Sequence, residues 1–394
     1  MKLQAQSSRA LYGALQKSAK GVGGKTMIAI LDHVLLSRCD DGKYMFTTAT
    51  SDSQLCLPAP LTEIDAKLDK PVALPIGILT QFLATLPDCV VTFNFNSEST
   101  FLLEYCTGDG DKMKSGKAQF AYMLGDEFPT MAKPEAGATH FSLPYAAFDG
   151  ALKQAIPFIK NDELRPVMSS LLIDIAEDLS NITFVGTNGH MLYKQTYCND
   201  PERGGSNFYR GGEARQVKIN NAFFRTLAAF DGQTDIDIES DGHIIRFSSG
   251  DMDFLCKEVE AKYPNYNSVI PRNNPFYVTF SKKEMLSIVK RVTLFTSENS
   301  NIVKVEKNGM FIDVSTEDKD FSQGAHDQVI IADAECTDGF KIGFNASVLQ
   351  TVVNAIQGDT VRMQLSDASR AAVLTADEPS PCALALCMPT VLGD

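Results

Sequence analysis

The hydrophobic positions of this chain repeat at a long interval. Leu11, Phe148 and Met285 lie 137 residues apart, and each is followed four residues later by another apolar side chain. That spacing places both side chains on one face of a helix. A second apolar set with the i, i+4, i+7 spacing recurs in every repeat, at Leu79, Leu83 and Leu86, at Phe223, Leu227 and Phe230, and at Leu349, Val353 and Ile356. Solenoid repeats span roughly 20 to 50 residues, so this longer period predicts three copies of one domain, each with its own core.

The same patterns predict the elements of each copy. Helices are predicted at residues 8–20, 77–86, 145–160, 220–230, 282–291 and 346–357. Alternating apolar runs at 91–95, 236–238 and 361–365 predict half-buried strands, and Asp-Gly or Asn-Gly pairs at 41–42, 241–242 and 308–309 predict tight primed turns. The predicted fold class is α+β, with two helices packed on antiparallel sheets in each copy. Clusters of Pro, Gly and Asn predict domains at 1–135, 136–272 and 273–394, while 107–117 and 199–215 are predicted to be surface loops.

Composition narrows the class of protein. At 394 residues, 44% hydrophobic and 22% charged, the chain is long enough for about three globular domains. No segment approaches the roughly 18 apolar residues of a membrane span, and no apolar leader is visible, so we expect a cytoplasmic protein that binds no membrane. The nine cysteines form no CxxC pair, which favours buried reduced thiols over disulfides or zinc. No cofactor or metal is expected.

Charge is distributed unevenly along the chain. The formal net charge of -13 argues against a protein that grips nucleic acid over its whole surface. The six predicted helices nevertheless hold ten basic residues and only two acidic ones, Asp149 and Glu284, a net charge of +8. The basic residues are Arg9, Lys17, Lys20, Lys153, Lys160, Arg225, Lys282, Lys283, Lys290 and Arg291. If these helices share one surface, that surface attracts phosphate; the alternative is that they are solvated helix faces.

Several segments resemble a known family. The segment DELRPVMSSLLIDI at 162–175, followed by FVGTNGHMLY at 184–193, resembles the middle domain of the bacterial DNA polymerase III beta subunit, the sliding clamp. Further segments agree with that family: Gly23, Gly24 and Lys25 with its first loop, KYPNYNSVIP at 262–271 with its FPDYxxVIP stretch, KIGFN at 341–345 with its GFN helix entry, and LCMP at 386–389 with its MPMRL ending. The order and spacing match over essentially the whole chain.

The resemblance implies a non-catalytic processivity factor. In that family two protomers close head to tail into a six-domain ring, and helices line a hole through which duplex DNA passes. The expected partners are double-stranded DNA without sequence preference, a second copy, the replicative DNA polymerase catalytic subunit, the clamp-loader complex and other clamp-motif proteins. Lys25 matches a basic DNA-contacting residue of the family, and Arg165 is expected near the same face. The basic residues of the predicted helices are expected to contact DNA collectively, and this expectation is the weaker one.

The resemblance also implies a hydrophobic groove for partner peptides and a dimer interface. The groove residues carried over from the family are Met168, Thr187, Gly189, His190, Met191, Leu192, Pro264, Ser268, Val269, Asn345, Val348, Leu386, Cys387, Met388, Pro389 and Thr390. An adaptable apolar slot with Met side chains suits an extended peptide. The expected dimer interface comprises Leu294 and Phe295 from the third domain and Phe120 and Tyr122 from the first. Core packing at a domain boundary is the alternative reading of most groove residues.

Four positions depart from the family pattern and make the groove less basic. Basic residues are usual where this chain has Met191 and Ser268, and a Met-Arg pair is usual where it has Thr390 and Val391. Two rival functions remain open. An enzyme would use His190 as a general base with Asp162 or Glu163, although the sequence contains no nucleophile elbow, phosphate loop or nucleotide fingerprint. A triplicated scaffold, or a divergent clamp copy, would bind protein partners only.

Overall fold

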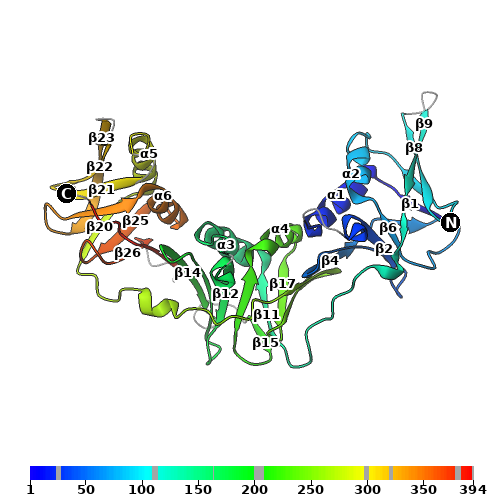
Figure 1. The fold of residues 1–394 in the computed structure, drawn as a ribbon, viewed down its shortest axis with the longest axis horizontal. Coiled ribbons are helices and arrows are strands. Elements are labelled where there is room, and N and C mark those ends of the chain that lie inside the picture. The colour runs from blue at the N-terminus through cyan, green and yellow to red at the C-terminus, as the bar shows by residue number, and fades with distance from the viewer. Residues whose placement is uncertain are drawn as a thin grey trace. The chain divides into compact units, whose positions relative to one another are not determined.

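The computed structural model describes residues 1–23, 28–108, 114–162, 164–198, 208–296, 301–318, 323–377 and 383–392. It divides into two compact units, whose elements are labelled in Figure 1. The first unit comprises Met1–Phe148, Arg210–Glu213 and Ala222–Glu258, and the second comprises Asp149–Tyr209, Ala214–Asn221 and Val259–Asp394. The first unit therefore holds the first repeat with part of the second, and the second unit holds the rest.

All six predicted helices are present. They are α1 (Ser8–Ser18), α2 (Ile76–Ala84), α3 (Tyr145–Ala155), α4 (Phe224–Leu227), α5 (Lys282–Thr293) and α6 (Ala346–Ala355). Side chains that accept hydrogen bonds from the first turn fix three of the starts, namely Ser7 for α1, Ser281 for α5 and Asn345 for α6. The second helix of the middle repeat is shorter than predicted, because α4 is a single turn between the 3₁₀ turns Asn221–Phe223 and Ala228–Phe230.

The repeated apolar positions lie in the core, as predicted. Leu11, Phe148 and Met285 are all fully buried. The pairs α1–α2 and α5–α6 pack together, and α5 also contacts the strands of its own repeat. Leu79 and Leu349 are fully buried at the equivalent position of the second helix. The 137-residue period therefore records a repeated core, in which the equivalent apolar positions of the helices are buried.

The first unit is built from two antiparallel sheets. Its five-stranded sheet has the order β5 (Thr62–Glu63), β1 (Lys2–Ala5), β7 (Val91–Asn94), β8 (Thr100–Thr107), β9 (Lys114–Ala121). The ten-stranded sheet has the order β10 (Met123–Leu124), β6 (Val72–Leu74), β2 (Val34–Arg38), β3 (Tyr44–Ala49), β4 (Ser53–Pro58), β19 (Met252–Lys257), β18 (Ile244–Ser249), β17 (Asp235–Ser240), β11 (Thr139–Pro144), β15 (Tyr209–Gly211). Pairing of β4 with β19 joins the first repeat to strands of the second.

The second unit is built on one twelve-stranded sheet. Its order is β16 (Gln216–Asn220), β12 (Ser170–Ile175), β13 (Asn181–Thr187), β14 (Met191–Cys198), β27 (Ala383–Cys387), β26 (Ala372–Ala376), β25 (Thr360–Leu365), β20 (Phe276–Ser281), β23 (Gln323–Glu335), β22 (Phe311–Asp318), β21 (Ile302–Asn308), β24 (Lys341–Asn345). Here the pairing of β14 with β27 joins strands of the second repeat to the third.

Each repeat contributes the same two four-stranded ladders. The ladder β1-β7-β8-β9 recurs as β11-β17-β18-β19 and as β20-β25-β26-β27, and the ladder β6-β2-β3-β4 recurs as β16-β12-β13-β14 and as β24-β21-β22-β23. The last strand of one ladder joins the last strand of the other at β4–β19 and at β14–β27. Among the described strands, β9 and the first half of β23 are left without an equivalent neighbour.

Some predicted details are wrong. Residues 107–117 are not a plain surface loop, since β8 and β9 pair as a hairpin up to Thr107 and Lys114; residues 209–211 of the second predicted loop are strand β15. At the three predicted turns φ is positive at the glycine alone, for example 89° at Gly42, whereas a primed turn of type I′ needs it at both central residues. Among the eight cysteines that the structure describes, all are free, but Cys39, Cys106 and Cys198 are exposed rather than buried.

Candidate functional site

Three of the predicted DNA-binding cations gather in the first unit. Lys17 and Lys20 lie at the carboxyl end of α1 and its following 3₁₀ turn, and Arg225 lies on α4. The Lys17 Nζ donates to the main-chain oxygen of Asp231 over 3.1 Å, and the Lys20 Nζ donates to that of Ala228 over 2.8 Å. Carbonyl groups at helix ends carry partial negative charge, so they hold these ammonium groups without cancelling their charge.

The electrostatics of the cluster confirm that its charges crowd together. The pKa of Lys20 is lowered by its burial and by the charge of Lys17, an effect that Asp231 opposes and Arg225 reinforces. The Arg225 guanidinium itself donates to the main-chain oxygen of Ala19 over 3.4 Å. Within the described part of the chain, no carboxylate forms an ion pair with Lys17, Lys20 or Arg225. The cluster therefore keeps a net positive charge, which Asp231 offsets only in part.

Three other predicted cations are neutralised by neighbouring carboxylates. The ion pairs are Lys153–Asp149 at 2.6 Å, Arg165–Asp162 at 2.8 Å and Arg291–Asp327 at 2.6 Å. The guanidinium groups hold the pKa of Asp162 and of Asp327 below the ordinary value, chiefly through the hydrogen bonds that they donate. The net charge of +8 on the predicted helices therefore overstates the positive field, because Asp327, which balances Arg291, lies outside those helices. The Arg165–Asp162 pair lies wholly outside them and is neutral in itself.

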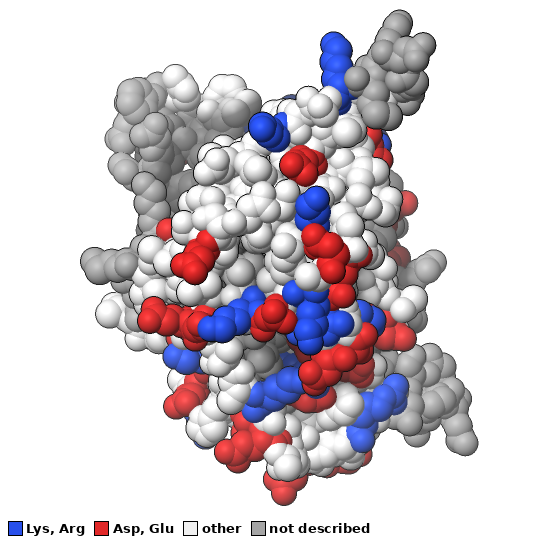
Figure 2. All heavy atoms as spheres, turned by 90° about the vertical axis from the view of Figure 1, so that its right-hand side faces the viewer, with Lys and Arg blue, Asp and Glu red and all other residues white. Residues whose placement is uncertain are grey.

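The remaining predicted cations differ in their surroundings. The Lys282 Nζ donates to the main-chain oxygen of Ile356 at the end of α6 over 2.6 Å, and burial lowers its pKa. Lys160, Lys283 and Lys290 are exposed. Lys25 lies outside the described residues. On the face shown in Figure 2, basic and acidic side chains are interspersed, so that face presents no extended surface of one sign.

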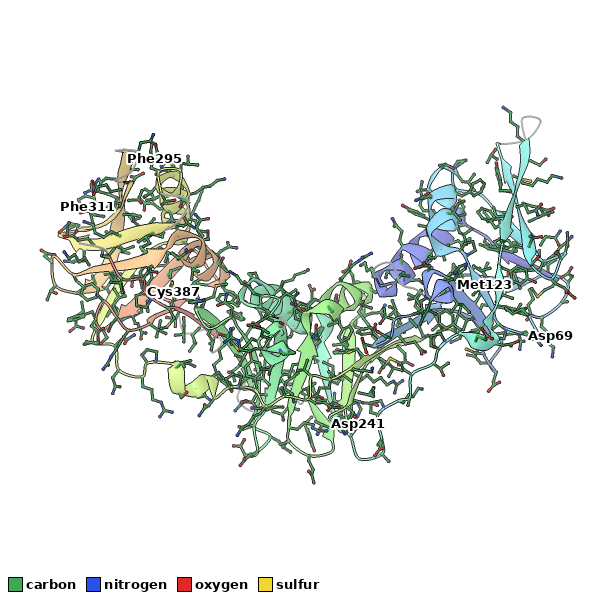
Figure 3. The ribbon with its side chains drawn as sticks, viewed as in Figure 1. Asp69, Met123, Asp241, Phe295, Phe311 and Cys387 are labelled. Atoms are coloured by element: carbon green, nitrogen blue, oxygen red, sulfur yellow. The ribbon has the colours of Figure 1, made fainter. Side chains whose placement is uncertain are left out.

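The predicted groove residues all lie in the second unit. Met191 and Leu192 on β14 lie opposite Cys387 and Leu386 on β27. These four side chains are at most 5% exposed, and Met168 and Thr187 are buried as well. Burial raises the pKa of the Cys387 thiol far above its ordinary value; Figure 3 shows this residue on the sheet. These members are buried and therefore do not line an open surface.

Further predicted groove residues lie in a turn and in the chain end that contacts it. The Thr187 hydroxyl donates to the Met191 carbonyl oxygen over 2.8 Å and accepts from the amide of Gly189, where φ is 87°. The Met388 amide then donates to the His190 carbonyl oxygen over 2.9 Å, which ties the chain end to this turn. This hydrogen bond places His190 and Met388 side by side, and both residues are exposed.

The chain end continues along β24. The Thr390 amide donates to the Gly343 carbonyl oxygen over 2.8 Å. A Cβ atom at Gly343 would lie 2.5 Å from the Thr390 oxygen, so only glycine permits this approach. Two residues further on, Asn345 caps α6, and the half-buried Val348 lies in its first turn. Pro389 is half-buried between these contacts.

The remaining predicted groove residues lie at 264–269. Tyr263 and Tyr266 are buried in one cluster with Leu172, Leu192 and Leu386. The Tyr266 hydroxyl donates to the Asp174 carboxylate over 2.7 Å. These contacts anchor the 3₁₀ turn Tyr266–Val269, while Pro264, Ser268 and Val269 are exposed. The structure thus brings the predicted groove residues into one region of the second unit.

The predicted dimer residues fall into two classes. Leu294 and Phe295 follow α5 and are 79% and 41% exposed, which is unusual for such large apolar side chains; Figure 3 labels Phe295. Tyr122 is half-buried, and its hydroxyl donates to the Ser97 carbonyl oxygen. Phe120 departs from the prediction, because it is 7% exposed and packs against Phe82 and Phe101 inside the first unit.

Two of the three residues of the rival enzymatic site, His190 and Asp162, are described by the structure. His190 is exposed in its turn, while the Asp162 carboxylate accepts hydrogen bonds from the Arg165 guanidinium and main-chain amides. Glu163 lies outside the described residues. In the described ranges no group of three metal-ligating side chains is found. Likewise, none of the helices that the structure describes is long and apolar enough to cross a membrane.

Comparison with known proteins agrees with this architecture. The family profile for the C-terminal domain of the DNA polymerase III beta subunit matches residues 267–390. The beta sliding clamp of Synechocystis is 25% identical over 381 residues, 93% of each chain, and that of Bacillus subtilis is 22% identical over 383 residues, 94% of each chain. The structure is also similar to a Pseudomonas aeruginosa sliding clamp bound to griselimycin, with 19% identity, a TM-score of 0.86 and complete coverage of both chains. A Thermotoga maritima beta subunit gives a TM-score of 0.83 at 18% identity.

The fold and the threefold repeat define the class of protein: its tandem α+β domains have the DNA-clamp fold. Within that class, the chain is similar to the DNA polymerase III beta subunits, the beta sliding clamps, and its residues 267–390 match the C-terminal domain of that family.

Proposed function

We propose that this protein is a DNA sliding clamp, a processivity factor that encircles duplex DNA and tethers the replicative DNA polymerase. Two protomers, each with domains at 1–135, 136–272 and 273–394, close head to tail into a six-domain ring. The observation that carries the proposal is the cluster of Lys17, Lys20 and Arg225 at helix ends in a chain of net charge -13. In this family the helices line the hole, and the cluster supplies positive charge where DNA passes.

The contacts of the cluster suit a ring that must slide. Lysine and arginine bind phosphate oxygens without reading the sequence, and such contacts exchange readily with counterions. Retention on DNA then comes from the closed ring, so individually weak contacts suffice. Lys160, Lys283 and Lys290 are exposed cations that add to this field, and Lys25 is proposed to do so from its loop. Lys153, Arg165 and Arg291 contribute less, because their charges are already balanced.

The unpaired strand edges support ring closure by a second copy. Of the last strands of the described ladders, four are joined in pairs, at β4–β19 and at β14–β27. The remaining two last strands are β9, which corresponds to β19 and β27, and β23, which corresponds to β4 and β14. Along their first eight residues, β9 and β23 show the same succession of exposed and buried positions. Exposed edges of this length invite pairing. Leu294 and Phe295 lie in the same repeat as the β23 edge and are proposed to be covered by the second copy.

The groove in the second unit is the proposed docking site for partner peptides. The replicative polymerase catalytic subunit, the clamp-loader complex and other clamp-motif proteins are proposed to insert an extended apolar peptide there. His190, Val269 and Met388 are exposed above a buried apolar floor and offer the first contacts. Because Met191, Ser268, Thr390 and Val391 replace residues that are usually basic or Met-Arg in the family, the preferred peptide is expected to be more apolar.

The protein is proposed to have no catalytic activity of its own; polymerase activity belongs to the holoenzyme that it tethers. In a bacterium this role places the protein in the cytoplasm. A clamp-like scaffold that binds only proteins is the alternative, and DNA topology separates the two. A clamp loaded on nicked circular DNA stays bound until the circle is linearised and then slides off the end.

The test combines that topology assay with charge removal. The wild type is expected to remain on the circle and to be lost after linearisation. A Lys17→Gln, Lys20→Gln, Arg225→Gln triple variant is expected to bind DNA more weakly, with a log–log salt dependence that falls by about one for each phosphate contact removed. Lys153→Gln is the matched control, because Asp149 already balances that charge. Binding that is indifferent to linearisation and to the triple substitution would contradict the proposal and favour the scaffold.

A further inference from the structure

The first unit contains a second copy of the backbone frame that carries the proposed peptide groove. In the second unit this frame, called the docking frame below, consists of the turn 188–191 that leads into β14 and of residues 386–388 at the end of β27. In the first unit the corresponding parts are the turn 50–53 that leads into β4 and residues 255–257 at the end of β19. The two copies can therefore be compared position by position.

The correspondence follows from the strand ladders of the two repeats. Leu55 of β4 lies opposite Phe254 of β19. Likewise, Tyr193 of β14 lies opposite Ala385 of β27. Counted across its ladder from the strand before the second helix, Leu55 occupies the same position as Tyr193. Counted from the strand after that helix, Phe254 occupies the same position as Ala385, so the two joints share one register.

The main chain closes both copies of the docking frame with the same hydrogen bond. In the second unit the Met388 amide donates to the His190 carbonyl oxygen over 2.9 Å. At the corresponding positions of the first unit, the Lys257 amide donates to the Asp52 carbonyl oxygen, also over 2.9 Å. Because the strand register and the closing hydrogen bond both recur, the backbone of the docking frame is present twice in the chain.

Two further features of the docking frame recur. In each turn the first side chain accepts a hydrogen bond from the third amide, at Asn188 over 2.9 Å in one copy and at Thr50 over 3.1 Å in the other. The two residues before the closing amide are a leucine and a cysteine in both copies, and none of them is more than 4% exposed. They are Leu386 and Cys387 in the second unit and Leu255 and Cys256 in the first. Each copy therefore has the same apolar support.

The two copies differ in the side chains that they expose. In the second unit these are His190 and Met388. In the first unit the Lys257 Nζ lies 2.7 Å from the Asp52 carboxylate, and the two side chains are 58% and 49% exposed. A peptide with apolar anchors that covers Met388 removes apolar surface from water, which is favourable. The same peptide over the Asp52–Lys257 pair would remove water from both charges, which is costly.

The neighbouring polar side chains of the first-unit copy are bound within the protein. Gln54 accepts a hydrogen bond from the Met131 amide over 2.8 Å, whereas the corresponding Leu192 packs in an apolar cluster. Glu258 is 6% exposed, and its carboxylate accepts a hydrogen bond from the Ser240 hydroxyl over 2.5 Å. Since these groups need no partner from a peptide, the exposed ion pair is the main obstacle to an apolar occupant.

We propose that the first unit holds a latent second docking site for partner peptides with apolar anchors, which the Asp52–Lys257 ion pair keeps closed. This inference rests on the proposed function, because the occupant is the class of peptide that is proposed to bind the second unit. Asp52 and Lys257 are then specificity-determining residues that direct partners to one of the two frames. A matched control exists at the other end of the β4–β19 joint, where Lys43 and Asp251 form an ion pair of 2.7 Å outside the frame.

The first test moves the exposed side chains of one frame into the other. Asp52→His with Lys257→Met is expected to raise the number of bound peptides per protomer from one to two. The count is made by native mass spectrometry with a synthetic peptide that carries leucine and phenylalanine anchors. Lys43→Met with Asp251→His, which removes the control ion pair, is expected to leave the count at one. A folded Asp52→His, Lys257→Met variant that binds one peptide, or a wild type that already binds two, would overturn the inference.

The reciprocal change tests the charges in the second unit, where no new site has to form. His190→Asp with Met388→Lys is expected to weaken peptide binding at least tenfold, whereas the uncharged pair His190→Asn with Met388→Gln is expected to weaken it less. Equal weakening by the two variants would refute the role of the charges. A wild type that binds no peptide would overturn the proposed peptide docking as well, whereas a wild type with one site and a frame exchange without effect would overturn this inference alone.

Discussion

Truncation of the two apolar residues after α5 should open the ring without unfolding the protomer. In the isolated chain the Leu294 side chain is 79% exposed and that of Phe295 is 41% exposed, so neither contributes much to the core. Complete burial of a leucine or phenylalanine stabilises by about 1.5–3 kcal/mol. Only the exposed part of each side chain can still be buried at a joint between protomers. Burial of that part contributes roughly 2 kcal/mol for the pair at each joint. A head-to-tail ring has two identical joints, so Leu294→Ala with Phe295→Ala is expected to cost about 4 kcal/mol, or about a thousandfold in dissociation constant.

The assay for this double variant measures mass and stability separately. Light scattering over a dilution series should show the wild type at twice the 43.0 kDa protomer mass and the variant at the protomer mass. Thermal unfolding of the variant should match that of the wild-type protomer measured below its dissociation constant. As a contrast, Leu11→Ala removes a fully buried side chain and should cost the protomer about 2–5 kcal/mol. An unchanged dissociation constant, or an unfolding temperature lowered as in Leu11→Ala, would refute the reasoning.

Three further outcomes are expected. At pH 8 a thiol reagent should modify Cys106 in the native protein, whereas Cys387, which is fully buried with a strongly raised pKa, should react only after unfolding. Modification of Cys387 in the native protein would contradict the packing described above. The Lys257 ammonium lowers the pKa of Asp52 in the native state, so the pair stabilises at pH values above about 4, where the unfolded carboxyl is ionised, and this stability is lost as the pH falls through the lowered native value. The difference in urea midpoint between wild type and Asp52→Asn should accordingly be present at pH 7 and vanish in acid. Gly343→Ala should displace the chain end and weaken capture of a clamp-motif peptide in a fluorescence anisotropy assay, with the dimer mass unchanged; full peptide affinity would show that the chain end is not part of the groove.

The sequence was a good guide to the helices because their signal is local. The 137-residue period was confirmed because each helix must bury one face in its own repeat, which constrains residues three and four apart. The exception was α4, where the aromatic pair Phe223 and Phe224 has low helix propensity and Thr226 donates its hydroxyl to the Lys20 carbonyl oxygen. There the contacts with the 3₁₀ turn Ala19–Gly21, which follows α1, decide the local backbone.

The site was less predictable because its charges interact over long distances. The Lys153–Asp149 pair was accessible from the sequence, since the two residues lie one helical turn apart. The pairing of Arg291 with Asp327 was not, because 36 residues separate them and only the fold brings β23 beside α5. Residues 114–117, the first half of β9, lie in the predicted loop because their Lys, Ser and Gly residues lack an apolar alternation, a composition that suits an edge strand.

The continuity of the sheets has a practical consequence for dissecting the molecule. A fragment cut at residue 273 would keep the third repeat but strip β14 from β27, leaving Ala385, Leu386 and Cys387 on a newly bared edge. A cut at residue 135 would likewise bare β4 by removing β19. Bared edges of this kind associate with one another, so single-repeat fragments should precipitate even when their own cores are intact. A soluble fragment therefore has to carry the neighbouring strands of the middle repeat along with it.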